Sequence, residues 1–397
     1  MKIIIIGTGV AGSVMADMLA KKGHKITLIE KDSRPGGMCK SYYKGGFTYE
    51  YGPHILATHN CSKKSENYIK SKIETIPTQL TSGSFLKKTL TYFPPSIYSA
   101  KKLNILSVVK KELKNLPKIP DEANFEKYLI SKVGKSLYEL FFYSFTKKFW
   151  NIEPKKLSAD WAKMRHLGED IKTKKMFFNN KWCSYPKKDW NELFKNLLKN
   201  QHVLYDVEVK LVDFKNKKIL LKDGHKIKYD FLISTMPIDK LFNFKRKKLD
   251  YTGYRIEPKI INRKHFAKLD NIPLSMVYYP EKNTAQCRVS DYGTFQKKIE
   301  FPYNNRTIVT YEIPDNGIRL YPFVDKKNDQ KFQDYLNLAA KEKNVMSFGR
   351  LGLYKYLTTD TTVEMAFRAV DFLDKWKKLD VKGRLSAYKY IRGDWNN

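Results

Sequence analysis

The 397-residue chain lacks a hydrophobic run long enough to cross a bilayer. A membrane-spanning helix needs about 20 consecutive, mainly apolar residues, whereas the four isoleucines after Lys2 stop at a glycine motif. This run is also too short for the apolar core of a signal peptide. We therefore expect a cytoplasmic protein that has no membrane partner.

Cysteine is scarce, and the four cysteines are scattered along the chain. Cys39, Cys61, Cys183 and Cys287 form neither a CxxC pair nor a metal-ligand spacing. The sequence therefore predicts no disulfide framework and no metal site, which agrees with a reducing compartment.

Acidic residues are few as well, because 41 Asp and Glu face 75 Lys and Arg, giving a formal net charge of +34. The lysines occur in every segment and form no long basic block or known nucleic-acid-binding module. A general lysine bias explains this distribution better than a dedicated polyanion surface does. We expect no nucleic-acid partner, although a positive field would attract a small anionic substrate.

The N-terminus has the pattern of a nucleotide-binding βαβ unit. Residues 2–6 form a continuous apolar run typical of a buried parallel strand. Residues 13–22 then predict a helix, and residues 25–29 predict a second strand that ends at Glu30. A carboxylate in this position can accept hydrogen bonds from the ribose hydroxyls of an adenosine.

Gly7, Gly9 and Gly12 form a GxGxxG motif between the first strand and the helix. The first glycine makes the tight turn, the second lets a pyrophosphate approach the backbone, and the third allows close helix–strand packing. The pyrophosphate would bind the amides at the helix N-terminus. Since strand, helix, spacing and terminal acid agree, the motif predicts dinucleotide binding.

A second glycine pair, Gly36-Gly37, follows Arg34-Pro35 and favours FAD over NAD. It resembles the extended FAD fingerprint of large two-domain flavoproteins, although an ordinary surface turn would have the same sequence. The expected cofactor-binding residues in this region are Gly7, Gly9, Gly12, Glu30, Lys31, Gly36 and Gly37.

The rest of the chain predicts insertions between segments of the nucleotide domain. The pattern is mainly helical over residues 101–175 and turns to strands from Val203, the first of them predicted over residues 203–213. Residues 230–235 read as a buried strand, 330–343 as a helix and 362–376 as a last helix. The expected fold is α/β, with a Rossmann-like FAD-binding domain in discontinuous segments, a helical subdomain and an antiparallel β-sheet subdomain. The predicted boundaries are 1–80, 200–250 and 335–397 for the FAD domain, 100–175 for the helical subdomain, and 81–99, 176–199 and 251–334 for the sheet or substrate subdomain.

Tyr51-Gly52-Pro53-His54-Ile55 closely resembles a segment of the UDP-galactopyranose mutases. Matches to the same family follow in order over nearly the whole chain, which makes them stronger together than singly. They are Phe93-Pro94, Thr146-Lys147-Lys148-Phe149-Trp150, Met236-Pro237-Ile238-Asp239, Thr307 to Glu312, Tyr321-Pro322, and Gly349-Arg350-Leu351 with Tyr354-Lys355-Tyr356.

The resemblance implies an isomerase that interconverts the pyranose and furanose forms of a nucleotide sugar, UDP-galactose or a related UDP or dTDP sugar. The reaction is net non-redox but requires reduced FAD, whose N5 attacks the anomeric carbon and displaces the nucleoside diphosphate. The flavin therefore supplies the covalent chemistry, while the protein supplies position and charge. The expected partner is the nucleotide-sugar substrate, and the expected assembly is at most a homodimer.

The resemblance also assigns roles to individual residues. Arg288 matches an arginine beside the flavin and the diphosphate, where a guanidinium fork can bind the leaving group. Tyr321 and Tyr356 match tyrosines that donate to the phosphates, and Trp150 matches a tryptophan of the sugar-binding wall. His54 and Arg350 match positions around the isoalloxazine. Without the resemblance, each of these residues would be interpreted as structural.

Four positions depart from the family pattern. Counting from Trp150 places Met164 where the family has a mobile-loop arginine, with Arg165 one residue later. Either Arg165 acts after a one-residue shift or the loop works differently, because a lysine could not replace the bidentate fork. Phe145, Thr358 and Ala57 replace a uridine-contacting tyrosine, an aspartate and a second histidine, which favours a sugar nucleotide other than UDP-galactose.

Two other functions stay open at this point. A redox flavoenzyme of the amine-oxidase or desaturase type would share the FAD domain but would leave Arg288, Tyr321 and Tyr356 unexplained. A non-catalytic or nucleic-acid-binding Rossmann protein would account only for the positive charge.

Overall fold

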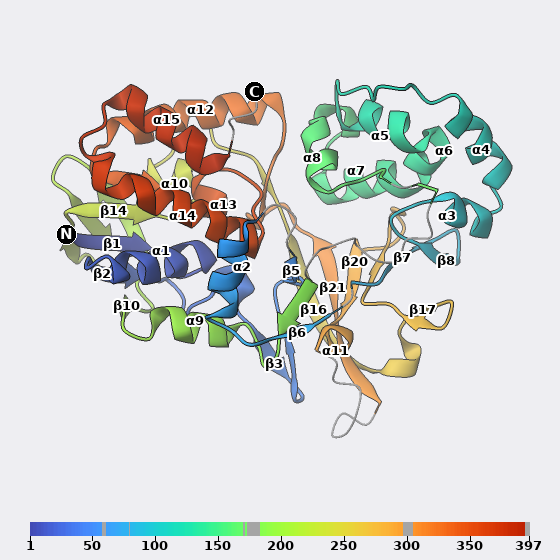
Figure 1. Ribbon diagram of the computed structural model, residues 1–397, viewed down its shortest axis with the longest axis horizontal. Coiled ribbons are helices and arrows are strands. Elements are labelled where there is room, and N and C mark those ends of the chain that lie inside the picture. The colour runs from blue at the N-terminus through green and yellow to red at the C-terminus, as the bar shows by residue number, and fades with distance from the viewer. Residues whose placement is uncertain (58–60, 79, 170, 173–182, 297–304, 394–397) are drawn as a thin grey trace.

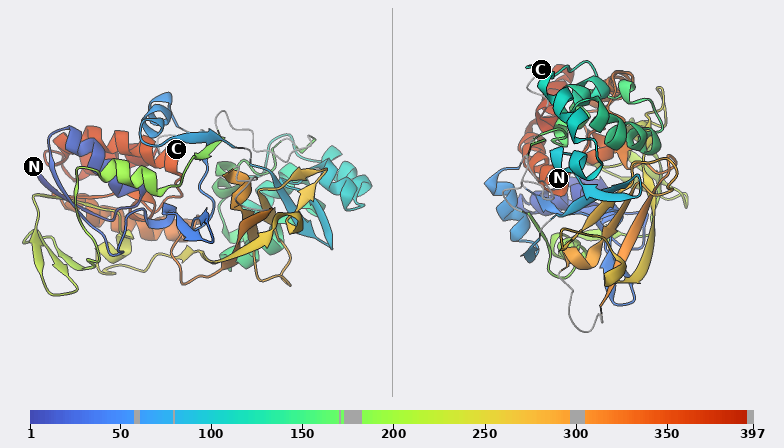
Figure 2. Two further views of the ribbon diagram at one scale, coloured as in Figure 1. Left: turned by 90° about the horizontal axis from the view of Figure 1, so that it is seen from below. Right: turned by 90° about the vertical axis from the view of Figure 1, so that its right-hand side faces the viewer.

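The computed structural model describes residues 1–57, 61–78, 80–169, 171–172, 183–296 and 305–393. One half of the molecule holds the N-terminal strands and the C-terminal helices, and the other half holds a helical group above a second sheet (Figure 1). The molecule is elongated when viewed from below (Figure 2). Within the described ranges, no helix is long and apolar enough to span a membrane.

A five-stranded parallel sheet forms the centre of the N-terminal half. Its strands lie in the order β10-β2-β1-β14-β23, and every adjacent pair is parallel. β1 and β14 are the most apolar strands and occupy the inner positions, where both faces of a parallel sheet are covered. The bounds are Lys2–Ile6 (β1), Lys25–Ile29 (β2), His202–Leu204 (β10), Phe231–Ser234 (β14) and Val345–Ser347 (β23).

Helices cover this sheet and complete a Rossmann-like domain, as the sequence predicts. α1 packs against both α14 and α9, while α15 packs against α14 and α12 (Figure 1). The rings of Trp376 and Tyr388 meet edge-on at 5.0 Å and join α14 to α15 in the core. The bounds are Val10–Lys21 (α1), Asn191–Leu198 (α9), Lys326–Lys341 (α12), Thr359–Trp376 (α14) and Val381–Arg392 (α15).

Several elements differ from their predicted bounds, including α12 and α14, which begin at Lys326 and Thr359 instead of residues 330 and 362. α1 begins at Val10 instead of residue 13, because Gly9 is already its N-cap. The strand predicted over 203–213 is two strands, β10 and β11, in different sheets, since the chain turns at Asp206 with a φ of 57°. The helix at 362–376 is not the last one, because Asp380 caps the further helix α15 by accepting a hydrogen bond from the Gly383 amide.

A six-stranded sheet forms the base of the other half, in the order β16-β21-β20-β19-β7-β8. Its pairs are antiparallel except for β19 with β7. The longest ladder joins β16 to β21 over nine residue pairs and forms one side of the sheet. The bounds are Ser82–Leu86 (β7), Thr89–Tyr92 (β8), Tyr254–Asn262 (β16), Met276–Tyr278 (β19), Arg288–Asp291 (β20) and Arg306–Pro314 (β21).

The helical group lies above this sheet, as Figure 1 shows, and fills the segment that the sequence predicts to be mainly helical. A π-helical stretch, Glu139–Tyr143, interrupts it between α6 and α7, a feature that often marks functional sites. The bounds are Ile97–Lys102 (α3), Leu106–Lys114 (α4), Phe125–Val133 (α5), Lys135–Tyr138 (α6), Ser144–Trp150 (α7) and Ala159–Met164 (α8).

Residues 183–198, grouped with the substrate subdomain by the sequence, lie against the nucleotide-binding half. β9 (Cys183–Pro186) pairs with both β5 and β6, and α9 packs on α1. Residues 176–182 of the same predicted segment lie outside the described residues. The remaining elements are β3 (Tyr42–Lys44), β4 (Phe47–Tyr49), β5 (Leu56–Ala57), α2 (Lys63–Lys70), β6 (Thr75–Pro77), β11 (Val209–Asp213), β12 (Lys218–Leu221), β13 (Lys226–Lys228), α10 (Ile238–Leu241), β15 (Tyr251–Thr252), β17 (Lys268–Leu269), β18 (Ile272–Pro273), α11 (Tyr292–Phe295), β22 (Tyr321–Pro322) and α13 (Gly349–Gly352).

Candidate active site

Gly7 and Gly12 are required by the fold of the turn between β1 and α1. Gly7 has a φ of 95°, and a Cβ there would lie 2.2 Å from the Thr235 hydroxyl. A Cβ on Gly12 would lie 1.9 Å from the Gly7 carbonyl oxygen. Both glycines therefore have a structural reason that is independent of any ligand.

Gly9 is different, because the protein alone does not require a glycine there. Its φ of −66° and ψ of −178° are extended backbone that any residue adopts. The nearest heavy atom to an added Cβ would be the Gly37 Cα at 3.9 Å. The side chain would therefore enter open space at the N-terminus of α1, where the first amides of a helix lack intrahelical partners. A pyrophosphate fits this cradle, and a side chain would fill it.

The second glycine pair lies directly against this cradle. Gly36 forms a parallel bridge with Gly9, and its amide donates to the Thr8 carbonyl at 3.0 Å. Gly36 and Gly37 have φ values of 117° and 54°, and a Cβ on Gly37 would lie 3.2 Å from the Gly9 Cα. An independent surface turn does not explain this contact, whereas a two-part nucleotide cradle does.

Glu30 ends β2 and ties the turn together. It is 5% exposed and accepts hydrogen bonds from the Thr8 amide at 2.8 Å and the Thr8 hydroxyl at 2.6 Å. Its other oxygen accepts from the Asp32 amide at 3.0 Å. The neighbouring Lys31 has 68% of its side chain exposed, and its Nζ lies 4.0 Å from a carboxylate oxygen of Asp32.

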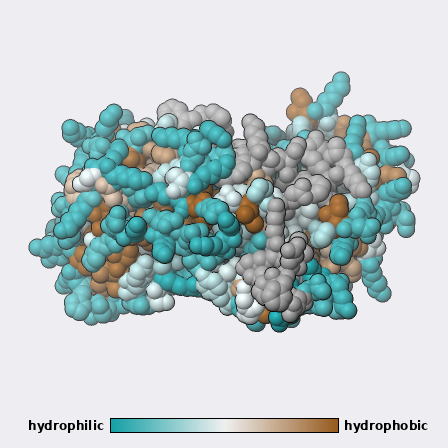
Figure 3. Space-filling view, turned by 60° about the horizontal axis from the view of Figure 1, so that its bottom comes forward, coloured by the Kyte–Doolittle hydropathy of each residue, from teal (hydrophilic) through white to brown (hydrophobic). Residues whose placement is uncertain are grey.

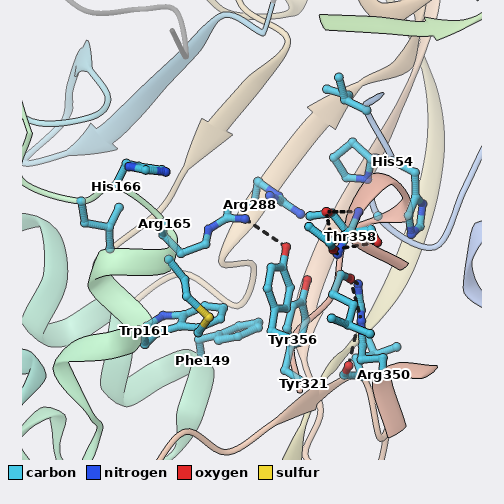
Figure 4. A pocket seen from close by; sticks show the side chains of 18 of the residues that line it. His54, Phe149, Trp161, Arg165, His166, Arg288, Tyr321, Arg350, Tyr356 and Thr358 are labelled. Carbon is cyan, nitrogen blue, oxygen red and sulfur yellow. Dashed lines mark hydrogen bonds between the residues drawn. The ribbon is translucent and has the colours of Figure 1, made fainter. Parts of the chain in front are cut away.

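A cavity of about 830 Å³ lies between the two halves of the molecule. Its wall combines residues of the helical group, of the six-stranded sheet and of the segment after β23 (Figure 4). All seven residues that the sequence places around the flavin and substrate line it, namely His54, Trp150, Arg165, Arg288, Tyr321, Arg350 and Tyr356. The sequence positions are up to 302 residues apart, so the fold alone brings them together.

Arg288 reaches the cavity from β20 and is held by Glu312, its direct cross-strand partner on β21. The Nε atom donates to Glu312 Oε1 at 2.9 Å, and Nη2 lies 2.8 Å from Oε2. Burial is the largest influence on Arg288 and opposes its charge, but Glu312 together with the surrounding tyrosines keeps the arginine's pKa well above its ordinary value. Nη1 lies 3.5 Å from the Tyr278 hydroxyl and is the part of the fork left for a ligand.

Arg165 follows the last residue of α8 and extends into the same cavity. Its Nη1 donates to the Tyr356 hydroxyl at 3.0 Å, a contact drawn as a dashed line in Figure 4. Met164, which occupies the family's arginine position by counting, also lines the cavity but carries no charge. Of these two adjacent residues, Arg165 is thus the one that brings a cation to the site.

Tyr321 and Tyr356 form the floor on which the arginines converge. Their rings stack at 5.6 Å with an interplanar angle of 14°. The Arg350 guanidinium lies 5.6 Å from the Tyr321 ring centroid and 5.0 Å from that of Tyr356. Its Nε donates to the Leu357 carbonyl at 3.1 Å, which fixes the guanidinium across both rings.

His54 lies at the opposite end of the cavity from α8, on the loop after Glu50 (Figure 4). The Trp190 indole donates to its carbonyl at 3.1 Å, while its buried Nδ1 has no hydrogen-bond partner among the described residues. Burial lowers the pKa of His54 to about 3, helped by the positive charge of Arg350. The ring is therefore neutral near pH 7, with one buried nitrogen left for a bound group.

Two tryptophans, Trp150 and Trp161, line the cavity, whereas the sequence predicts only Trp150 in the sugar-binding wall. Trp150 is 1% exposed and is packed edge-on against Phe323 and Trp161. Trp161, which sequence reasoning missed, is less buried and faces both Tyr321 and Tyr356. Its position four residues before Arg165, on a helix introduced by Ser158, was the available signal.

The residues that replace family side chains are also explained locally. Thr358 caps α14 and exchanges hydrogen bonds with Thr361. Unlike the family's aspartate, it has no carboxylate that could contact a substrate. Phe145 has no hydroxyl, and its ring stacks on Phe149 at 6.0 Å. Ala57 lies in β5.

The segment after β23 contacts the cradle and also lines the cavity. Gly349 has a φ of 83°, and a Cβ there would lie 2.8 Å from the Ala11 Cβ on the first turn of α1. The next residue, Arg350, lines the cavity. A long cofactor can therefore bind with its pyrophosphate at α1 and its reactive ring beside His54 and Arg350. Among the residues that the structure describes, no group of three or more His, Cys, Asp and Glu side chains could hold a metal ion.

Fold and site thus define a Rossmann-type nucleotide-binding protein with a cationic, aromatic substrate cavity. A family model for an NAD(P)-binding Rossmann-like domain matches residues 5–71, and one for UDP-galactopyranose mutase matches residues 140–356. The second match covers more than half of the chain. The chain belongs to the UDP-galactopyranose mutase family, whose members are isomerases, and the family and fold together imply a flavin cofactor.

Individual relatives agree over nearly the full length. A probable UDP-galactopyranose mutase of Klebsiella pneumoniae is 23% identical over 93% of this chain and 94% of its own. A dTDP-fucopyranose mutase of Escherichia coli is 22% identical over 95% of this chain and 99% of its own. The crystal structure of a reduced UDP-galactopyranose mutase matches 99% of this chain and 97% of its own, with a TM-score of 0.76 and 16% identity. These relatives support pyranose–furanose mutase activity over the redox alternative.

Proposed function

We propose that this protein binds FAD and, with the flavin reduced, interconverts the pyranose and furanose forms of a UDP or dTDP sugar. The observation that carries the proposal is the convergence of Arg165, Arg288 and Arg350 on the stacked pair Tyr321 and Tyr356. Arg165 and Arg288 in one cavity with two phenols suit a diphosphate, because arginine binds phosphate oxygens through paired donors. The segment after β23 connects the cavity wall to the nucleotide cradle.

The glycine turn would hold the cofactor's pyrophosphate, with Gly9 leaving room for it at the start of α1 and Gly36 and Gly37 packed closely beside that turn. Glu30 would accept from the ribose hydroxyls while keeping its bond to Thr8. His54 and Arg350 would lie against the isoalloxazine, which supplies the N5 nucleophile for the anomeric carbon when reduced.

Arg288 and Arg165 would bind the diphosphate on both sides and stabilise its charge as it leaves the sugar. The hydroxyls of Tyr321 and Tyr356 would donate hydrogen bonds to phosphate oxygens. The partly buried position of Arg288 strengthens this interaction, since an ion pair out of bulk water is screened less. Trp150 would back the sugar-binding wall from its buried position.

The replaced residues would affect the specificity of the site for the nucleotide base and the sugar. Phe145 contributes an apolar ring where the family pattern has a hydroxyl, and Thr358 contributes a cap where the pattern has a carboxylate. These changes favour a substrate related to UDP-galactose rather than UDP-galactose itself. A homodimer and a cytoplasmic location stay predictions.

A redox flavoenzyme is the second candidate, and it has less support because it gives no role to the arginine and tyrosine set. Nucleic-acid binding would account only for the positive charge and gives no role to the cavity. The face drawn in Figure 3 is largely hydrophilic, with hydrophobic side chains in scattered groups.

The decisive test is a panel of UDP and dTDP hexoses incubated with dithionite-reduced holoenzyme and analysed for furanose formation by chromatography. At least one sugar should reach a pyranose–furanose equilibrium, and oxidised enzyme should be inactive. Oxidation of a substrate with matching consumption of an electron acceptor, and no isomerised sugar, would support the redox candidate instead.

A further inference from the structure

The short helix α8 carries two residues that contact the same tyrosine. Trp161 and Arg165 are four positions apart, a spacing that places side chains on one side of a helix and its C-cap. The Trp161 ring meets the Tyr356 ring at 5.3 Å and 87°, an edge-to-face geometry. The Arg165 guanidinium donates to the hydroxyl of that same ring at 3.0 Å.

Trp161 is also fixed from behind. Its ring meets Trp150 at 5.1 Å and 82°, and Tyr321 at 6.3 Å and 80°. Trp150 is 1% exposed, and Tyr321 is stacked on Tyr356, so these partners are themselves immobilised. The indole therefore links α8 to aromatic residues of α7, β22 and the segment before α14.

This link answers the question of register that the sequence leaves open. Arg165 follows α8 as its C-cap, and the chain reverses at His166 with a φ of 51°. The direction of Arg165 therefore depends on how α8 sits on the aromatic cluster. Trp161 is the α8 side chain whose ring contacts this cluster in the described structure.

We propose that Trp161 is a positioning residue that docks α8 against Tyr356 and so holds Arg165 at the diphosphate of the nucleotide sugar. The proposal rests on the proposed function for the identity of the ligand, but the contacts that carry it are independent of the flavin. Arg165 lies one residue away from the family's arginine position, and the Trp161 indole would compensate for this shift by orienting α8.

A double-mutant cycle separates this role from direct contact with the substrate. The proteins are the parent, Trp161→Ala, Arg165→Ala and the double variant, all as reduced holoenzyme. We expect Trp161→Ala to lower kcat/KM about tenfold, a coupling typical of side chains in contact. In the Arg165→Ala background the same change should cost less than about twofold. Trp161→Phe should recover most of the activity, since a smaller ring can still meet Tyr356 edge-on.

A second measurement does not depend on turnover. The affinities for UDP and dTDP, measured by calorimetry on the oxidised holoenzyme, should show the same non-additive pattern. Lys163→Ala is the matched control on α8, because Lys163 points to Glu122 with its Nζ 2.5 Å from the carboxylate. It should leave affinity and turnover within about twofold of the parent.

Equal losses in both backgrounds would overturn the proposal, because Trp161 would then act on the substrate or on stability as a whole. If Trp161→Ala does not fold, judged by circular dichroism, the cycle with Trp161→Leu and Arg165→Ala decides in its place, because leucine fills part of the space but has no ring to meet Tyr356. A parent protein that binds UDP or dTDP but isomerises no sugar would contradict the proposed function, while the affinity cycle would still test Trp161.

Discussion

Removing the Arg288 side chain is the most direct test of where the diphosphate binds. Arg288→Ala takes away the guanidinium that β20 presents to the cavity, but it also strips Glu312 of its partner. Glu312 is 1% exposed, so the variant would bury a carboxylate without an opposite charge. Two separate losses are therefore expected, one in catalysis and one in stability.

The catalytic loss follows from the number of donors that face the ligand. Arg288 uses Nε and Nη2 to hold Glu312, and this fixes the direction of Nη1. Removing one such preorganised donor typically costs about 10²–10³ in turnover. Breaking a buried ion pair from one side typically destabilises a protein by about 3–5 kcal/mol. Burial already raises the pKa of Glu312 despite Arg288, so the abandoned carboxyl should take up a proton and reduce this cost.

Arg288→Lys distinguishes the two effects, because an ammonium restores the charge but not the planar fork. A lysine that satisfies Glu312 cannot keep a second donor in the fixed direction of Nη1. We expect Arg288→Lys to regain stability relative to Arg288→Ala while turnover stays at least about 10²-fold below the parent.

The assay measures steady-state turnover on the best nucleotide sugar, together with flavin content and thermal midpoint in the same samples. Flavin content should stay near the parent's, since the cradle at α1 is separate from β20. Turnover of Arg288→Ala within a few-fold of the parent would refute the assignment of Arg288 to the diphosphate site.

Three further outcomes are expected. Gly9→Val should fold with a parent-like circular dichroism spectrum but lose bound FAD, because its side chain enters the cradle without meeting protein atoms. Gly12→Val should fail to fold, and a Gly9→Val protein with full flavin occupancy would contradict the assignment of the cradle to the pyrophosphate. Mutase turnover should need reduced flavin yet consume no stoichiometric reductant, so a proportional loss of dithionite equivalents per product would speak against it. Burial raises the pKa of Glu50 to about 8, so between pH 4.5 and 8 the folded protein holds a proton that the unfolded chain releases. The free energy of unfolding should therefore fall as the pH rises through this window, by at most about 1.4 kcal/mol per pH unit. The thermal midpoint of Glu50→Gln should lack this pH-dependent component, and an unchanged pH profile in that variant would exclude it.

The nucleotide half was predictable because its signals are local. The alternation of strand and helix, the glycine spacing and Glu30 all lie within thirty residues, and β1 and β2 have the predicted bounds. The contact of Gly36 with Gly9 was not available from the sequence, because it depends on the path of the loop after β2. α15 was missed since its apolar face is interrupted by charged and small residues.

The cavity was predictable only in part, and by resemblance. Periodicity could name Arg288 and Glu312 as strand residues, but their pairing depends on the register of β20 with β21. The same limit applies to Trp161, whose partners come from α7, β22 and the segment before α14. Counting residues from a motif predicts a position well only while the register with the family is kept. Counting from Trp150 reaches Met164, whereas the structure shows that Arg165 donates to Tyr356.

The high net charge and the charge of the site have different physical consequences. Most of the 75 basic residues are solvent-exposed lysines, whose fields are screened within about 8–10 Å at physiological salt. Arg165, Arg288 and Arg350 are partly buried and held by Tyr356, Glu312 and the Leu357 carbonyl, so their donors keep fixed directions at any ionic strength. General positive charge can speed the approach of an anionic nucleotide sugar. Selection of the departing diphosphate, in contrast, needs donors that are already in place when its charge develops. Arg165 and Arg288 meet that requirement, and the dispersed lysines do not.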